Sequence, residues 1–279
     1  MRRVFALFLS LLMLSSSGLL DIVAFATGLG QDRETTGQEV VGETVSIPVG
    51  EIEVEGTEPE KLDAAVYAAK VLDEETMLLY AAIDSETCQI MGYSGEETNL
   101  VIPSALGGLT VTAIGNRAFS NSKLESVTLP DTLTYIGQSA FAECKNLTSV
   151  RIPDSVTQID FGAFTHCLNL EDVQLSGQLA YIGRSAFENC EKLECVEIPD
   201  TVSEIGFAAF MDCASLSSVT YPVNLQKTGS HIFADCPALK EIEVPEGVTY
   251  LPDDVFNGST LQTVKLPSTL VTIGDQAFF

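Results

Sequence analysis

The chain has 279 residues and carries 39 acidic against 14 basic side chains, which gives a net charge of −25 and a pI near 4.1. This excess of negative charge excludes nucleic acid and anionic membranes as expected partners, because both require Lys and Arg to neutralise phosphate. We interpret most of the acidic residues as a solvated surface. Diffuse calcium binding is the alternative, but no EF-hand loop or Gly/Asp nonapeptide array supports it.

Residues 1–26 have the pattern of a secretory signal peptide. A basic start, Met1-Arg-Arg3, precedes an apolar run over residues 4–14, and Ala24-Phe-Ala26 fits the small-x-small rule for cleavage. We expect the mature chain to begin at Thr27. An uncleaved anchor is the alternative, but the apolar run is short for a membrane span and Asp21 interrupts its extension. No later segment has ~20 continuous apolar residues, so we expect the mature chain not to be transmembrane.

Residues 27–59 form an acidic linker by composition. The stretch is rich in Gly, Glu and Thr, as in Gly50-Glu-Ile-Glu-Val-Glu-Gly56, and it has few aromatic side chains. High charge with little apolar surface favours a mobile connection. The alternation of Val45, Ile47 and Val49 is also compatible with a short strand.

Residues 60–98 are expected to form an N-terminal cap. Apolar side chains at spacings of four and three, from Leu62 to Leu72, predict an amphipathic helix over residues 59–72. Two apolar runs, at 77–83 and 88–91, predict a β-hairpin. A stack of repeats needs an atypical first unit to cover its apolar end, and these residues lie where that unit belongs.

From residue 99 to residue 279 the pattern LxxVxIPxxVxxIGxxAFxxC recurs about eight times. The phenylalanines that close the copies are separated by 22 or 23 residues, at Phe119, Phe141, Phe164, Phe187, Phe210, Phe233, Phe256 and Phe278. A fixed period of this size indicates stacked structural units, because one such unit cannot bury its own apolar side chains. The eighth copy has no polar replacement for a ninth, so we expect an uncapped C-terminal coil.

Each copy contains a short strand and a turn back. Val196 and Ile198 alternate with Glu197 at the strand period of two, and a proline that cannot donate to a β-ladder follows in most copies. The glycine of the Ile-Gly pair indicates either a positive φ or a close approach of backbones between coils. The phenylalanines are predicted to stack as a buried column. Irregular copies are marked by Asp160, by Thr228-Gly229 and by Pro252.

These repeats resemble the leucine-rich repeat family, and specifically its bacterial BspA-like (Treponema pallidum-type) class. The resemblance rests on the LxxVxIPxxVxxIGxxAFxxC copies and on the lead-in from Ile90 to Pro103, and it covers residues 88–279. The fold class that we predict is a β-rich solenoid of leucine-rich repeats, in coils of about 23 residues, with a small α+β N-terminal cap. The resemblance implies a secreted or surface-exposed protein that acts in adhesion and protein recognition rather than in catalysis.

Five cysteines recur one coil apart, at Cys144, Cys167, Cys190, Cys213 and Cys236. A disulfide ladder or a metal site would use them functionally. However, equivalent positions in parallel coils point their Cβ atoms in the same direction, and a linear column does not supply tetrahedral ligands. We therefore interpret them as buried, unpaired thiols, although secretion favours oxidation. Cys195 falls on the outward strand row and is predicted to be an exposed, reactive thiol, whereas Cys88 has no evident partner.

The candidate ligand surface consists of two outward rows that offer one side chain each per coil. A rigid sheet that presents side chains in this way is the usual binding surface of repeat proteins. The rows contain no aromatic residue, so we expect polar contacts with the ligand. The candidate residues are Ser126, Thr128, Ser149, Arg151, Asp172, Gln174, Cys195, Glu197, Ser218, Thr220, Glu241, Glu243, Thr263 and Lys265.

The function that we predict is a secreted or surface-exposed binding or adhesion module that recognises a protein or other extracellular ligand through these rows. The partner that we expect is an extracellular protein of host or bacterial origin. The alternative is the non-catalytic targeting region of a larger secreted enzyme. No GxSxG, P-loop or HExxH motif occurs, and His166 and His231 have no acidic or cysteine partner at ligand spacing. We therefore expect no catalytic residues, no cofactor and no metal. The uncapped last coil suggests either a longer array or self-association at that end.

Overall fold

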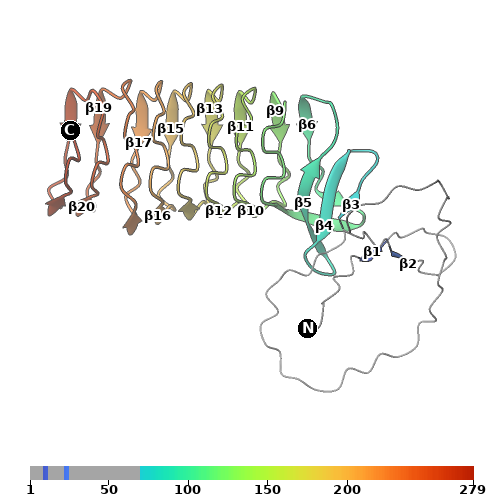
Figure 1. Ribbon diagram of the computed structural model, residues 1–279. Coiled ribbons are helices and arrows are strands. Elements are labelled where there is room, and N and C mark those ends of the chain that lie inside the picture. The colour runs from blue at the N-terminus through green and yellow to red at the C-terminus, as the bar shows by residue number, and fades with distance from the viewer. Residues whose placement is uncertain (1–8, 12–21, 25–69) are drawn as a thin grey trace, which may run out of the picture. The chain divides into compact units, whose positions relative to one another are not determined.

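The computed structural model describes residues 9–11, 22–24 and 70–279 (Figure 1). The chain divides into two units, residues 1–69 and residues 70–279. In the first unit β1 (Leu9–Leu11) pairs with β2 (Ile22–Ala24) in antiparallel fashion. Apart from these six residues, the predicted signal peptide and the linker at 27–59 lie outside the described residues, and both remain predictions.

The second unit begins with antiparallel strands. A hairpin is formed by β4 (Leu78–Ala82) and β5 (Thr87–Tyr93), as the sequence predicts, and β3 (Val71–Leu72) lies along β4. The predicted helix over 59–72 is wrong at its end, because Val71 and Leu72 are extended and pair with Tyr80 and Leu79. Backbone pairing with the hairpin overrides local helix propensity there. The rest of that helix, residues 59–69, lies outside the described residues.

The repeats build two parallel sheets on different sides of the coils (Figure 1). Up to residue 228, each strand of both sheets pairs with the equivalent strand of the next coil, and β5 pairs with β8 (Leu109–Ile114) to connect the hairpin to the second sheet. The first sheet contains β6 (Asn99–Val101), β9 (Ser126–Thr128), β11 (Ser149–Arg151), β13 (Asp172–Gln174), β15 (Cys195–Glu197) and β17 (Ser218–Thr220), and it is followed by the separate pair β19 (Glu241–Glu243) and β21 (Thr263–Lys265). The second contains β8 (Leu109–Ile114), β10 (Tyr135–Ile136), β12 (Gln158–Ile159), β14 (Tyr181–Ile182), β16 (Glu204–Ile205) and β18 (Lys227–Thr228), with β7 (Ala105–Leu106) antiparallel to β8 and the separate pair β20 (Tyr250–Leu251) and β22 (Thr272–Ile273).

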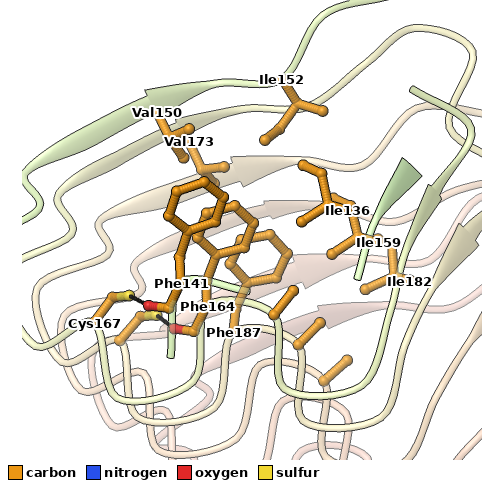
Figure 2. Packing of buried hydrophobic residues seen from close by; sticks show 14 of the residues in the cluster. Ile136, Phe141, Val150, Ile152, Ile159, Phe164, Cys167, Val173, Ile182 and Phe187 are labelled. Carbon is orange, nitrogen blue, oxygen red and sulfur yellow. Dashed lines mark hydrogen bonds between the residues drawn. The ribbon is translucent and has the colours of Figure 1, made fainter. Parts of the chain in front are cut away.

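The core between the sheets is organised around the phenylalanine column, which confirms the predicted stack. The rings of Phe141, Phe164 and Phe187 lie parallel to one another, 5.1 and 5.2 Å apart between centroids (Figure 2). Each ring is fully buried between the valines of the first sheet and the isoleucines of the second. Because each ring is covered by the rings of the coils before and after it, burial is a property of the stack rather than of one coil.

The glycines of the Ile-Gly corners are required by a close approach of backbones. A Cβ on Gly183 would lie 2.5 Å from the carbonyl carbon of Asp160, and a Cβ on Gly137 would lie 2.8 Å from the Ile114 oxygen. The left-handed φ instead falls two residues later, at Ser139 and Ser185 for example. The structure thus decides between the two interpretations of these glycines. Where Asp160 replaces the glycine, its carboxylate accepts hydrogen bonds from the Tyr135 hydroxyl and the Phe161 amide, both at 2.6 Å.

The apolar side chains of the last coil are partly exposed in this chain. Leu266 and Ile273 have exposed fractions of 44% and 47%, whereas their equivalents Ile198 and Ile205 are buried. That the last coil is uncapped stays a prediction. Self-association at this end stays a prediction.

Candidate ligand-binding surface

The fourteen candidate residues all lie on the outer face of the strands β9, β11, β13, β15, β17, β19 and β21. Thirteen of them are exposed and Ser126 is half-buried. The apolar residue between each pair is buried in β9, β11, β13, β15 and β19, half-buried in β17 and 37% exposed at Val264 in β21. We call the set of candidate residues the ligand face. Its residues are brought together by the stacking of coils, since neighbours on the face are separated by 22 or 23 residues in the sequence.

Parallel pairing aligns the first row of the ligand face. Ser149 pairs with Asp172, Asp172 with Cys195, and Cys195 with Ser218. Neighbouring strands in a sheet are about 4.8 Å apart, so the row presents one side chain at each such step along a fixed line. The rigid spacing means that a ligand meets a preformed set of groups rather than mobile loops.

A hollow of about 540 Å³ lies over the middle of the ligand face. Asp172, Cys195 and Glu197 line it from the face, and Asp200 lines it from the turn after β15. A second hollow, of about 550 Å³, lies beside Ser126 and is lined by Asn146, Asn169 and Lys192 among others. The sequence prediction missed Asp200 and the Asn146 group. The signal for them is the same coil period, which places Asp200 at the position of Asp131 and Asp154, with Gly177 in the coil between, and aligns Asn146, Asn169 and Lys192 in successive coils.

The ligand face is predominantly negative. It contains Asp172, Glu197, Glu241 and Glu243 but only two cations, Arg151 and Lys265. Lys265 is paired with Glu243 at 2.9 Å, and this hydrogen bond raises the pKa of Lys265. Both side chains are exposed, so the ion pair contributes little stability, and either side chain can pair with a group of a ligand instead.

The cysteine ladder is buried and its thiols are free, as predicted. The structure adds a role that the sequence did not reveal, because each thiol donates to the carbonyl oxygen of the phenylalanine in the coil before it. Cys167 reaches the Phe141 oxygen at 3.1 Å and Cys190 reaches the Phe164 oxygen at 3.3 Å (Figure 2). Burial raises the pKa of Cys190 to about 12. These thiols are therefore structural hydrogen-bond donors, in contrast to the exposed Cys195.

Exposed aromatic side chains occur on a different side of the array. Phe161 and Phe207 follow the corner positions of their coils and have exposed fractions of 41% and 37%. The Arg184 guanidinium lies over the Phe207 ring, 4.8 Å from its centroid. The ligand face itself has no aromatic residue, so its contacts are polar.

Among the residues that the structure describes, no group of three or more His, Cys, Asp or Glu side chains is placed to hold a metal ion. In the same part of the chain, no helix is long and apolar enough to cross a membrane.

The stacked parallel strands, the buried phenylalanine column and the outward rows define a leucine-rich repeat solenoid, a fold typical of protein-interaction modules. The model of the family described as "BspA type Leucine rich repeat region" matches residues 96–208 and 181–279 of this chain, in six copies. Because the matched residues make up more than half of the chain, the protein belongs to the BspA-type leucine-rich repeat family.

Crystal structures of bacterial leucine-rich repeat proteins are similar to this chain. The T. pallidum leucine-rich repeat protein is 28% identical, with a TM-score of 0.55, over 71% of this chain and 83% of that one. A leucine-rich repeat protein from Bacteroides ovatus is 29% identical, with a TM-score of 0.65, over 74% of this chain. The match spans 55% of the length of the Bacteroides protein. No curated protein matches the chain.

Proposed function

We propose that this protein is an extracellular binding module whose ligand face recognises a partner protein. The observation that carries the proposal is the ligand face itself, in which two rows of exposed side chains are held in register by parallel pairing and bear a hollow of about 540 Å³. Secretion is supported by the signal-peptide pattern of residues 1–26, and BspA-type proteins are typically found on bacterial surfaces or secreted.

The charge of the ligand face indicates a basic partner surface. Three carboxylates, those of Asp172, Glu197 and Asp200, line the central hollow, and no Lys or Arg lines it. A complementary cationic patch would accelerate association and fix the orientation of the complex. Since the face lacks aromatic anchors, we expect modest affinity that weakens as the salt concentration rises.

The test is a comparison of matched charge reversals in the chain from residue 27 to residue 279. Asp172→Lys combined with Glu197→Lys changes the ligand face, whereas Glu143→Lys combined with Asp275→Lys makes the same charge change away from it. Each variant is used to capture proteins from a panel of host mucosal and bacterial surface proteins. We expect the face variant to lose the captured partner and the control variant to retain it.

Cys195 provides an independent readout of the same contact. It is exposed within the central hollow, so a partner bound to the ligand face would slow its reaction with a thiol reagent. Capture that survives the face variant, or that leaves the labelling rate of Cys195 unchanged, would show that the partner binds elsewhere.

A further inference from the structure

The coil of residues 217–239 and the coil of residues 240–262 meet at a boundary that we call the joint. Within residues 70–279, every other pair of successive coils is connected in both sheets, but β17 is not paired with β19, and β18 is not paired with β20. Figure 1 shows the wider step between β17 and β19. Both sheets are therefore interrupted at the same boundary.

The backbone hydrogen bonds across the joint lie on one side of the coils only. The amides of His231, Phe233 and Asp235 donate to the carbonyl oxygens of the next coil, at 3.2, 2.9 and 2.7 Å. The side-chain ladder is also broken here. Ser259 stands in the cysteine position and donates to Phe256 of its own coil, at 2.6 Å, instead of to Phe233 of the preceding coil. The two coils can therefore move apart at both sheets, between β17 and β19 and between β18 and β20, without breaking a backbone hydrogen bond between those strands.

One cause of the interruption is Pro252, which occupies the corner position of the glycines. In the preceding step, the Gly229 amide donates to the Ile205 oxygen at 2.8 Å, and in the following step the Gly274 amide donates to the Leu251 oxygen at 2.8 Å. Proline has no amide hydrogen, so it cannot make the equivalent bond across the joint.

A second cause is the size of the buried side chains. Tyr221 replaces the aliphatic residue found at Ile198 and Val244, and its buried hydroxyl has no hydrogen-bond partner within the described coils. Ile232 and Val255 occupy the alanine position of the regular coils. The ring centroids of the phenylalanine column are 5.8 Å apart at the joint, between Phe233 and Phe256, compared with 5.6 Å at the boundaries on either side of it and 5.0–5.2 Å in the first four steps. Overfilled cores force backbones apart, which agrees with this spacing.

We propose that the joint is a hinge at which the last two coils, residues 240–279, change their angle to the coils before them. Hinge motions use boundaries where few contacts must break, and here three backbone hydrogen bonds on one side act as the pivot. The hinge divides the ligand face, because Glu241, Glu243, Thr263 and Lys265 lie beyond it. The face is therefore adjustable at one defined place, independently of which partner it binds.

The hinge is tested by distances between two spin labels on the full mature chain. Native Cys195 is exposed and the other described cysteines are buried, so Cys195 accepts one label. In the first sample Thr263→Cys carries the second label, three coils away and across the joint. In the matched control Ser126→Cys carries it, three coils away in the other direction and within regular coils. We expect a distance distribution on the order of twofold wider for the first pair, and equal widths would overturn the proposal.

A repaired joint completes the test. Tyr221→Ile combined with Pro252→Gly restores the residues of the regular coils, and we expect the wide distribution to narrow to that of the control. An unchanged width would contradict the assigned causes.

Hydrogen exchange of the unmodified chain is a second test, and it does not require the double variant to fold. There, the amides of Phe233 and Asp235 form the pivot and should be as protected as those of Phe187 and Asn189, which make the same bonds at a regular boundary. Exchange about tenfold faster at Phe233 and Asp235 would mean that the two coils come apart completely instead of bending, and would refute the hinge.

Discussion

The phenylalanine column makes Phe187→Ala the most informative test of how the array is stabilised. Phe187 is fully buried and stacks on Phe164 at 5.2 Å and on Phe210 at 5.1 Å. Its removal leaves a cavity that coils on both sides line, and the array cannot collapse into it without breaking the parallel register of both sheets. Phe→Ala changes in cores cost about 3–5 kcal/mol, and we expect the full range here because two stacking contacts are lost at once.

The measurement is the free energy of unfolding by urea, followed by circular dichroism because the chain has no tryptophan. Phe207→Ala is the matched control. Its ring is 37% exposed and contacts Arg184, so its loss should cost about 1 kcal/mol or less. If Phe187→Ala destabilises the protein no more than Phe207→Ala, the column does not carry the stability of the array.

Three further predictions follow from the ladder, the corners and the N-terminal pattern. Burial raises the pKa of Cys190 from its ordinary value of 9.0 to about 12, so its contribution to stability is complete below pH 9 and is lost as the pH rises towards 12. Unfolding measured between pH 8 and 11 should show this loss, and Cys190→Ser, which keeps a donor for the Phe164 oxygen, should reduce it. Gly206→Ala places a Cβ 2.7 Å from the Arg184 Cα and should cost about 1–3 kcal/mol. Gly177→Ala meets no atom closer than 3.6 Å and should cost within about 0.5 kcal/mol, and similar losses in urea unfolding would contradict the close-approach argument. The intact mass of the secreted protein should correspond to a chain that begins at Thr27, and a mass that retains residues 1–26 would indicate an anchor instead.

The periodic positions determine most of the fold, and they could be predicted because one physical requirement repeats. Phe141 and Phe164 recur at the same place in coils that cannot bury them singly, so the sequence alone requires a stack. The same period places Asp172 and Cys195 on one row of the ligand face. Turn residues beside that row, such as Asp200, belong to the surface because the tertiary structure brings the turns next to the strands.

The tertiary structure decided the features that depend on distances between coils. The sequence showed that a glycine recurs at the corner, but only the backbone of the preceding coil, close to Gly183 and Gly137, shows that steric contact rather than a positive φ requires it. Val71 and Leu72 continue a helical pattern in the sequence, yet pairing with β4 makes them a strand. Local preference is weak compared with the hydrogen bonds that a neighbouring strand offers.

The joint illustrates the same division within one coil. Pro252 and Thr228-Gly229 are visible in the sequence as departures from the repeat. The interruption of the two sheets depends on the missing amide hydrogen of Pro252 and on the summed volumes of three buried side chains in adjacent coils, Tyr221, Ile232 and Val255. These side chains belong to two different repeats, so their combined volume matters only where the two coils pack against each other. The sequence therefore determined the repeating core and the ligand face, and the packing of coil against coil determined where that face is able to bend.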